Sequence, residues 1–430
     1  MLNQNFSPEN LKRFLHNKRD VRKLKKQNNG QDEQAILTNI SYEIDSPNFS
    51  FKSLSLATLK GKSILRIKDI KETLVLRKLN ENLKRIYGVK QSNRREITKQ
   101  VLVLLQEPNP LYIIRLDIKS FFESMSLNDV LTPILEETLI SPTSKKILRS
   151  LNNHPITPPH IPRGVNISAT LSEIHMRRFD HNIKNQPGVY YYARYVDDII
   201  IFLYKDFLIK NRLDLYKLLP EGLKVQRKKT KNIPVNCRCM TQCICQNNCR
   251  CLAECKCALD PAKDITLDYL GYNFTFADIP KAPKGNKPNL KSISITLATR
   301  KVNRIKTRIS LALLDHIKTP NFDLLKSRCY FLTGNCEFLI KGDFTIRSGI
   351  YYNYPLLNQS DPALVNLTTY LRKAIHSKRG SFGVKLSAVL TNAQRSELGR
   401  LSFVSGFKNK ITYKMSEEKL GLIRECWKNA

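Results

Sequence analysis

The pattern of apolar and polar positions predicts a mixture of strands and helices. Leu111–Asp117 is a continuous apolar run that ends in an acid, which is typical of a buried strand. Val189–Tyr195 is rich in aromatic and β-branched residues, and residues 199–202 are its predicted hairpin partner. The residues between them are Val196, Asp197 and Asp198, so two adjacent carboxylates lie at or beside a tight turn.

Helical spacing dominates much of the remaining chain. Residues 67–105 and 300–314 place apolar residues at helical intervals, and residues 127–182 are predicted to be helices broken at prolines. A basic helix is expected near residues 18–26, and a further strand over residues 269–274. Residues 315–430 are α-helical in composition.

The net charge changes the picture most. Lys and Arg number 72 against 37 Asp and Glu, which leaves +35 and indicates a polyanionic partner, with nucleic acid the leading candidate. A hydrophobic content of 41% is that of a globular protein, and 430 residues predict two or three subdomains. The apolar run over residues 199–204 is far shorter than the roughly 20 residues that span a bilayer. We therefore expect a cytoplasmic protein without a membrane partner, and no signal peptide is recognisable at its start.

The carboxylates suggest a specific chemistry. If the strands that carry Asp117 and Asp197–Asp198 are neighbours, three acids meet at one edge of a sheet and repel one another. Divalent cations relieve that repulsion, and oxygen ligands favour Mg²⁺. Two such ions can activate a primer 3′-hydroxyl and stabilise departing pyrophosphate, so the pattern points to nucleotidyl transfer. The competing interpretation is an ordinary Asp-Asp turn.

Five sequence blocks stand out along the chain: residues 116–122, residues 161–164 with Ser168 and Leu171, residues 194–198, residues 229–230 and residues 270–272. In these blocks, which occur in the family's order, the chain resembles bacterial reverse transcriptases of the group II intron and retron type. The resemblance implies an α/β right-hand polymerase with fingers, a palm of antiparallel sheet plus helices, and a helical thumb. The expected division is an N-terminal extension (1–60), fingers and palm (61–277), a Cys-rich insert within the palm (236–260), a thumb (278–375) and a C-terminal helical segment (376–430).

The resemblance also implies roles for individual residues. Asp117 and Asp197 would bind both metals, Asp198 would be a weaker ligand, and the Ile118 carbonyl could contribute. Lys229 is a candidate for stabilising or protonating pyrophosphate, with a solvated lysine as the alternative.

Substrate contacts follow in the same way. Phe122 would be the steric gate against a ribose 2′-hydroxyl, with core packing as its alternative role. Gly164 would let the backbone approach the template or the incoming base, because it lacks a Cβ. Candidates for triphosphate contact are Arg77, Lys78, Arg85, Arg94 and Arg95. Candidates for nucleic-acid contact are Arg163, Ser168, Arg300, Arg304 and Arg308.

Two departures from the intron enzymes refine the resemblance. Arg163 stands where those enzymes usually have Gln, and Glu173 stands where their block ends in Asn. The sequence around Glu173 is more similar to antiviral, defence-associated reverse transcriptases. Residues 1–7 and 351–355 most resemble the first enzyme of the type 3 defence systems, which carry two reverse transcriptases and a non-coding RNA. The implied activity is RNA-templated DNA synthesis from dNTPs with Mg²⁺ or Mn²⁺ in antiphage defence, with a second reverse transcriptase or an oligomer as a candidate assembly.

Eight of the 11 cysteines form four Cys-X-Cys units, repeated every six residues. They are Cys237, Cys239, Cys243, Cys245, Cys249, Cys251, Cys255 and Cys257. Eight thiolates could fill two tetrahedral zinc sites, and an iron–sulfur cluster or a metal-free loop are the alternatives. We expect a zinc-binding insert that contacts nucleic acid or a partner protein.

Two other functions fit the same residues. One is a catalytically silent scaffold that binds RNA and a partner enzyme. The other is protein-primed or untemplated DNA synthesis.

Overall fold

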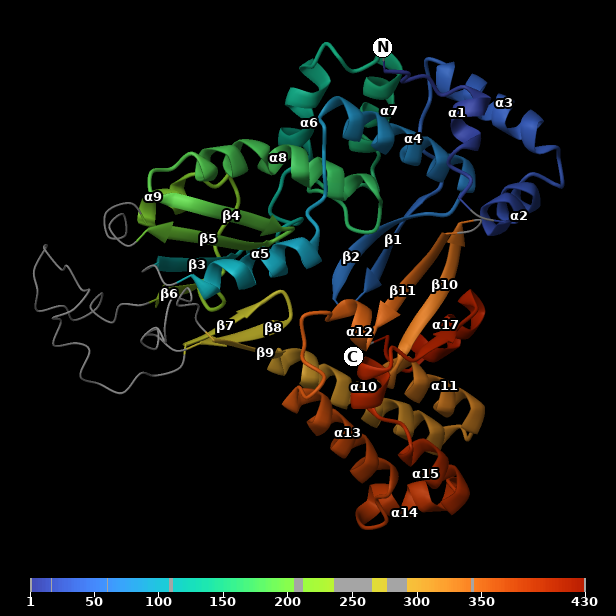
Figure 1. The fold of residues 1–430 in the computed structure, drawn as a ribbon. Helices are drawn as coiled ribbons and strands as arrows, with labels where there is room; N and C mark the ends of the chain where they lie inside the picture. Colours follow the sequence, from blue (N-terminus) through green and yellow to red (C-terminus); the bar gives the residue numbers. More distant parts are fainter. Residues whose placement is uncertain are drawn as a thin grey trace, which may run out of the picture. The chain divides into compact units, whose positions relative to one another are not determined.

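The computed structural model describes residues 2–16, 18–59, 61–107, 111–204, 212–235, 265–276, 292–341 and 344–428 (Figure 1). The chain divides into two compact units. Unit 1 is Met1–Asn93 with Pro110–Val235, and unit 2 is Arg94–Asn109 with Asn236–Ala430. The finer division into extension, fingers, palm and thumb stays a prediction.

Unit 1 combines helices with a sheet and a separate hairpin. Its helices are α1 (Pro8–Lys12), α2 (Lys18–Gln27), α3 (Glu33–Asp45), α4 (Ile70–Ile86), α6 (Leu127–Glu136), α7 (Pro142–Asn152), α8 (Ile167–Lys184) and α9 (Arg212–Lys217). Its strands are β1 (Leu54–Leu59), β2 (Lys62–Ile67), β3 (Leu111–Asp117), β4 (Val189–Tyr195), β5 (Asp198–Tyr204) and β6 (Lys231–Val235). The basic helix expected near residue 18 is confirmed as α2, and the proline-broken helices are confirmed as α6, α7 and α8.

The central sheet of unit 1 has the order β4–β5–β3–β6, with every pair antiparallel. The predicted strand Leu111–Asp117 and the predicted hairpin are both confirmed. Ile113 and Ile114 of β3 and residues 199–202 of β5 are completely buried, so both faces of the inner strands are covered. This burial explains why the two strands are apolar runs rather than alternating patterns.

Helix α8 packs against β4 and lies along the sheet (Figure 1). Ile167, Leu171, Met176, Phe179 and Ile183 are buried at helical spacing along α8. The helix also contacts α4 and α6. A single amphipathic helix therefore connects the sheet with the helical layer of unit 1.

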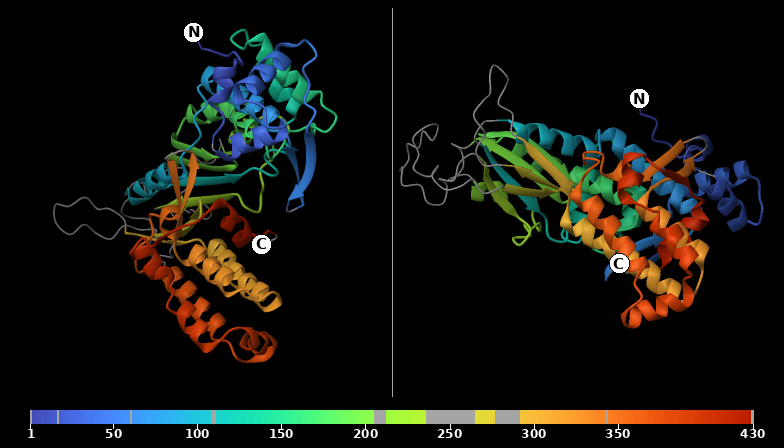
Figure 2. Two further views of the ribbon diagram at one scale, coloured as in Figure 1. Left: turned by 90° about the vertical axis from the view of Figure 1, so that its right-hand side faces the viewer. Right: turned by 60° about the horizontal axis from the view of Figure 1, so that its bottom comes forward.

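Unit 2 contains a small sheet, a helical region and a second sheet. Its elements are α5 (Arg94–Gln106), β7 (Ile265–Tyr269), β8 (Tyr272–Phe276), β9 (Ile293–Leu297), α10 (Thr299–Lys318), α11 (Phe322–Thr333), β10 (Asn335–Lys341), β11 (Phe344–Gly349), α12 (Ile350–Asn353), α13 (Pro362–Ile375), α14 (Gly380–Val389), α15 (Asn392–Gly399), α16 (Phe403–Lys408), β12 (Thr412–Lys414) and α17 (Glu417–Glu425). Helix α10 lies beside α11 and α13 (Figures 1 and 2).

Three expectations about elements are corrected. The strand expected over residues 269–274 is two strands, because Leu270 and Gly271 turn the chain at φ 44° and 87° between β7 and β8. The helical stretch expected over residues 67–105 is interrupted between α4 and α5, where Gly88 has φ 57°. The C-terminal part is not wholly helical, because β10 pairs with β11 and with the distant β12.

Two further predictions concern metal and membrane. The Cys-rich segment over residues 237–257 lies outside the described residues. Among the helices that the structure describes, none is long and apolar enough to cross a membrane.

Candidate active site

The register of the central sheet brings the predicted acids together. Asp117 is the last residue of β3 and lies directly opposite Asp198, the first residue of β5. Asp197 occupies the two-residue turn before β5, and its carbonyl accepts a hydrogen bond from the Ile118 amide at 3.3 Å. Asp117 is buried, with 6% of its surface exposed. The strands that carry the acids are therefore neighbours, as the sequence analysis required.

The turn itself is strained. Val196 is the first turn residue and has φ 60°, a conformation that β-branched residues rarely adopt. Backbone strain of this kind persists only where surrounding contacts enforce it. A tight turn at this point presents Asp197 next to the ends of β3 and β5.

Each of the two strand acids has a cationic partner. The Lys229 ammonium lies 3.0 and 3.1 Å from the two carboxylate oxygens of Asp117, and Arg115 donates to Asp198 at 3.0 Å. Lys229 reaches this point because the Gln226 amide donates to the Asp117 carbonyl at 2.7 Å and the turn that follows carries the lysine. Arg115 precedes Asp117 by two positions on β3, and the sequence analysis did not identify it.

Asp197 has the electrostatics of a cation site. Burial raises the pKa of its carboxyl, and the nearby charges of Asp198 and Asp117 raise it further, whereas a backbone hydrogen bond and Lys229 lower it. The ionised form is therefore disfavoured in the folded protein. An added cation would relieve this penalty.

The residues fit divalent ions in chemistry, and the structure shows them paired with protein cations. Asp117, Asp197, Asp198 and the Ile118 carbonyl supply the oxygen donors that Mg²⁺ prefers. Across the part of the chain that the structure describes, no group of three or more His, Cys, Asp or Glu side chains is arranged to hold a metal ion. The Lys229 ammonium shows that both Asp117 oxygens accept a cation, and because its side chain is 49% exposed it has room to move aside.

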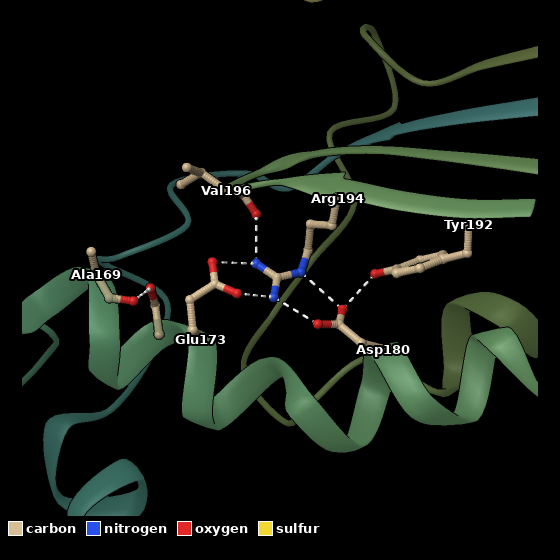
Figure 3. A network of polar contacts seen from close by, with 7 residues as sticks. Ala169, Glu173, Asp180, Tyr192, Arg194 and Val196 are labelled. Carbon is tan, nitrogen blue, oxygen red and sulfur yellow. Dashed lines mark hydrogen bonds and ion pairs between the residues drawn. The ribbon is translucent and has the colours of Figure 1, made fainter. Parts of the chain in front are cut away.

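A buried network fixes the hairpin that carries Asp197 (Figure 3). The Arg194 guanidinium donates to Glu173 at 2.6 and 3.0 Å, to Asp180 at 2.7 and 2.8 Å, and to the Val196 carbonyl at 3.2 Å. Tyr192 donates to Asp180 at 2.5 Å. Burial opposes the charge of Arg194, but hydrogen bonds and charges from Asp180 and Glu173 raise its pKa overall. Two acids of α8 thus hold an arginine of β4, which in turn contacts the strained turn.

A second cluster surrounds Phe122. The Arg163 guanidinium lies 4.9 Å from the centre of the Phe122 ring and donates to Glu123 at 2.6 and 3.0 Å. Gly164 has φ 98°, and a Cβ there would collide with the Ile64 side chain and lie 2.5 Å from the Leu65 carbonyl. Close packing against β2 is therefore sufficient reason for a glycine at this position.

Ser168, a predicted nucleic-acid contact, donates to the Pro162 carbonyl. It is buried, with 3% of its surface exposed. Its hydroxyl therefore shapes the loop over residues 161–164 from within the fold.

The predicted triphosphate contacts of α4 are engaged in other ways. Arg77 pairs with Asp20 at 2.6 Å, and Arg85 pairs with Glu81 at 2.6 Å. Lys78 is only 5% exposed and donates to the Asn3 carbonyl at 2.8 Å. Burial, the largest effect, lowers the pKa of Lys78. Arg77 and Lys78 thus connect α4 with the N-terminal residues, whereas Arg85 pairs within α4. The arrangement gives no support to a triphosphate role for Lys78.

Arg94 belongs to unit 2. It donates to the Leu270 carbonyl at 2.9 and 2.5 Å and to the Asn353 carbonyl at 2.8 Å. Its guanidinium lies 5.6 Å from the centre of the Tyr272 ring and 5.1 Å from that of Tyr354. The turn between β7 and β8 is therefore joined to α5 and to the tyrosine-rich segment after β11. Arg95, on the next position of α5, is exposed.

The predicted thumb contacts divide into two groups. Arg300 and Arg304 are exposed on α10, four positions apart and thus on one face. Arg308 is half-buried, and its guanidinium lies 5.5 Å from the centre of the Trp427 ring. Trp427 also donates to the Arg308 carbonyl at 2.9 Å. The first two arginines are available to a nucleic-acid backbone, whereas Arg308 is in contact with the segment that follows α17.

Comparison with known proteins assigns the domain. Residues 63–274 match the family model described as reverse transcriptase (RNA-dependent DNA polymerase). The chain contains a reverse transcriptase domain. This domain includes Asp117, Asp197, Asp198 and Lys229, together with the Arg163 and Arg194 clusters.

A solved structure is also similar to the chain, and it is a telomerase from Candida albicans in complex with a TWJ fragment of telomeric RNA. The sequence identity is 13% and the TM-score 0.31, over 81% of this chain and 53% of that chain. The chain thus spans about half the length of the telomerase chain. No curated protein sequence matches it.

Several residues of the site were not predicted from the sequence. Arg115, Glu123 and Asp180 were not identified, and Glu173 was noted only as a departure from the intron enzymes. One signal was present for the network in Figure 3: Arg194 interrupts a strand of apolar and aromatic residues. A charge at such a position requires a buried partner. The sequence does not show which acids provide it.

Proposed function

We propose that the protein is an RNA-directed DNA polymerase that adds dNTPs to a primer by two-metal nucleotidyl transfer. The observation that carries the proposal is the register of the central sheet, which sets Asp117 opposite Asp198 and places Asp197 in the adjoining turn. Two Mg²⁺ or Mn²⁺ ions, when bound, would activate the primer 3′-hydroxyl and stabilise the departing pyrophosphate. Asp117 and Asp197 would hold both ions, and Asp198 and the Ile118 carbonyl would complete the oxygen ligands.

Lys229, which pairs with Asp117 in the structure, also has a catalytic role in this proposal. Its ammonium neutralises Asp117 in the structure and is half-exposed. On binding of divalent ions it would leave the carboxylate and donate a hydrogen bond or a proton to pyrophosphate. We expect Lys229→Met to retain nucleic-acid binding and to lose most of the synthesis rate, measured with saturating dNTPs.

The deciding experiment is incorporation of labelled dNTPs by the purified full chain with the RNA that co-purifies. The wild type should extend a primer in the presence of Mg²⁺ or Mn²⁺. Asp197→Asn should abolish extension while the thermal unfolding curve stays cooperative. Asp45→Asn, at the exposed end of α3, is the matched control and should extend normally. Normal extension by Asp197→Asn would refute the two-metal assignment.

The biological setting is a further part of the proposal, and it rests on the sequence resemblance. We place the enzyme in the cytoplasm in antiphage defence, with a dedicated non-coding RNA as template and a second reverse transcriptase as a partner. Sequencing the nucleic acid that co-purifies with the protein tests this directly. A mixture of unrelated cellular RNAs would argue against a dedicated template.

The Cys-rich insert is proposed to bind two zinc ions through its eight cysteines. Elemental analysis of the purified chain should give about two zinc per chain, from four thiolates per site. The insert is proposed to contact nucleic acid or a partner protein. Unchanged RNA binding, partner binding and melting temperature after chelation would refute that role.

A silent scaffold is the second candidate function, and one observation favours it. Asp117 and Asp198 are each paired with a protein cation, Lys229 and Arg115 respectively. In a scaffold these pairs would be permanent. RNA binding without dNTP incorporation at any Mg²⁺ or Mn²⁺ concentration would establish it. DNA product that persists after removal of the RNA, or that stays attached to a protein side chain, would instead indicate untemplated or protein-primed synthesis.

A further inference from the structure

The Phe122 ring is held between two neighbours of different chemistry. The Phe121 ring meets it edge-on at a centroid distance of 5.3 Å and an interplanar angle of 74°. The Arg163 guanidinium lies 4.9 Å from the ring centre. Phe121 is buried, whereas Phe122 is partly exposed. The arginine therefore limits how far the exposed part of the Phe122 ring can move.

Glu123 fixes the plane of that guanidinium. Two hydrogen bonds of 2.6 and 3.0 Å join Arg163 to the two oxygens of Glu123, which is the fork geometry that orients an arginine. The hydrogen bond from Arg163 is the largest cause that lowers the pKa of Glu123 to about 2. A backbone hydrogen bond and the charges of Arg163 and Lys62 lower it further, although burial opposes the shift. Because Glu123 adjoins Phe122 in the chain, the acid, the arginine and the ring form one closed unit.

The backbone around Arg163 is equally fixed. The Leu65 amide donates to the Arg163 carbonyl at 2.7 Å, and Gly164 packs against the same strand, β2. Lys62, at the start of β2, lies 3.4 Å from Glu123. The loop that carries Arg163 is thus anchored to the hairpin β1–β2, and its guanidinium has little freedom to turn toward a template.

From this geometry we infer that Arg163 is a positioning residue for Phe122. It holds the ring where the ring excludes a ribose 2′-hydroxyl, and Glu123 holds Arg163. The inference rests on the proposed function, in which Phe122 selects dNTPs. It also revises the sequence-based expectation that Arg163 contacts nucleic acid. Substitution should therefore change the choice of sugar rather than the affinity for template.

The experiment compares kcat/KM for a dNTP and for the matching rNTP on a fixed RNA template with an annealed primer, using the full chain. Phe122→Ala should lose most of the preference for dNTP. Arg163→Met should lower the preference about three- to tenfold, the range of a single cation–π contact, with kcat for dNTP nearly unchanged. Arg163→Lys keeps the charge but not the fork, and should recover part of the preference.

Two further variants complete the design. Glu123→Gln leaves the arginine in place but weakens its anchor, so it should give an intermediate loss and it serves if Arg163→Met folds poorly. Arg347→Met is the matched control. Arg347 also pairs with a glutamate, Glu337 at 2.9 Å, and also lies over an aromatic ring, Tyr352 at 5.9 Å. It should leave sugar selection unchanged.

The outcomes separate this inference from the proposed function. A wild type that incorporates neither nucleotide overturns the proposed function and the inference with it. If Phe122→Ala loses the preference while Arg163→Met and Glu123→Gln both keep it, the inference alone is wrong. A raised KM for template with unchanged sugar selection in Arg163→Met would make Arg163 a template contact instead.

Discussion

Arg194→Met should destabilise unit 1 strongly. The Arg194 side chain is 4% exposed, and its acidic partners Glu173 and Asp180 are 17% and 22% exposed. Methionine fills a comparable volume but removes the guanidinium from Glu173, Asp180 and the Val196 carbonyl. Asp180 then keeps the Tyr192 hydroxyl as a donor but has lost the compensating positive charge. Removal of one partner from a buried ion pair costs about 3–5 kcal/mol. We take that range as the expected loss in the free energy of unfolding.

The origin of this cost can be tested with a neutral network. In the triple variant Arg194→Met, Glu173→Gln, Asp180→Asn, no buried charge is left without a partner. A buried charge without a partner is the costly element, and replacement of a whole buried ion pair by hydrophobic side chains of similar volume is often neutral or stabilising. Tyr192 can still donate to the side-chain amide oxygen at position 180. The triple variant should therefore be more stable than Arg194→Met alone, although it carries two more substitutions.

Thermal unfolding of the full chain, followed by circular dichroism, measures the effect. At about 2–4 °C per kcal/mol for a domain of about 200 residues, Arg194→Met should lower the first melting transition by roughly 6–20 °C. The exposed pair of Arg347 and Glu337 supplies the control, because Arg347→Met removes an arginine that is 55% exposed. A melting temperature for Arg194→Met within about 4 °C of the wild type would refute the reasoning, because an exposed ion pair contributes at most about 1 kcal/mol and hence about 4 °C. Equal melting temperatures of the single and triple variants would refute the charge argument.

Three other predictions follow from the same structure. Arg163 lowers the pKa of Glu123 from 4.5 to about 2. The ion pair therefore stabilises the fold above pH 4.5, and this contribution is lost as the pH falls toward 2. The difference in melting temperature between wild type and Glu123→Gln should shrink over the same pH range. Arg94→Ala removes the hydrogen-bond donors to Leu270 and Asn353 and the cation that contacts the Tyr272 and Tyr354 rings. Urea titration should show that the free energy of unfolding of unit 2 falls by about 2–4 kcal/mol. An unchanged free energy of unfolding of unit 2 would contradict this prediction. Asp197→Asn should raise the melting temperature at neutral pH, because it removes a partly buried charge that Asp198 and Asp117 repel. It should also remove the stabilisation that Mg²⁺ gives the wild type. A lower melting temperature, or an unchanged response to Mg²⁺, would contradict this account.

Strands and helices with a strong local pattern could be predicted from the sequence. Residues 111–117 and 189–195 became β3 and β4 with the expected bounds. The inner strand β3 is a continuous apolar run because both of its faces are covered, whereas the edge strand β4 is recognisable by its aromatic and β-branched residues. The strands β10 and β12 could not be found in this way. They are paired across more than 70 positions, Asn335 with Thr412, and short strands of mixed polarity have no local signal.

The acids of the candidate site were predictable, but their partners were not. Asp117 and Asp197 end or flank strong strand patterns, so a single assumption about strand pairing brought them together. Lys229 reaches Asp117 across 112 positions, and Arg163 reaches Glu123 across 40. Such pairs depend on how loops pack against distant strands, which hydrophobic periodicity does not encode. A charged residue in an apolar stretch indicates that a partner of opposite charge is needed, but only the folded structure identifies that partner.

The pKa values of Glu123 and Asp197 are shifted in opposite directions, which separates the roles of these two acids in the reverse transcriptase domain. Glu123 accepts two hydrogen bonds from Arg163, and its pKa is lowered, so its charge is already compensated by the protein. Asp197 is partly buried beside Asp198 and Asp117, and its pKa is raised, so the protein compensates its charge less than that of Glu123. An added cation gains most where the protein has left the greatest electrostatic penalty. Asp197, in the hairpin turn, is therefore the acid at which an added cation would gain most, whereas Arg163 already compensates the charge of Glu123.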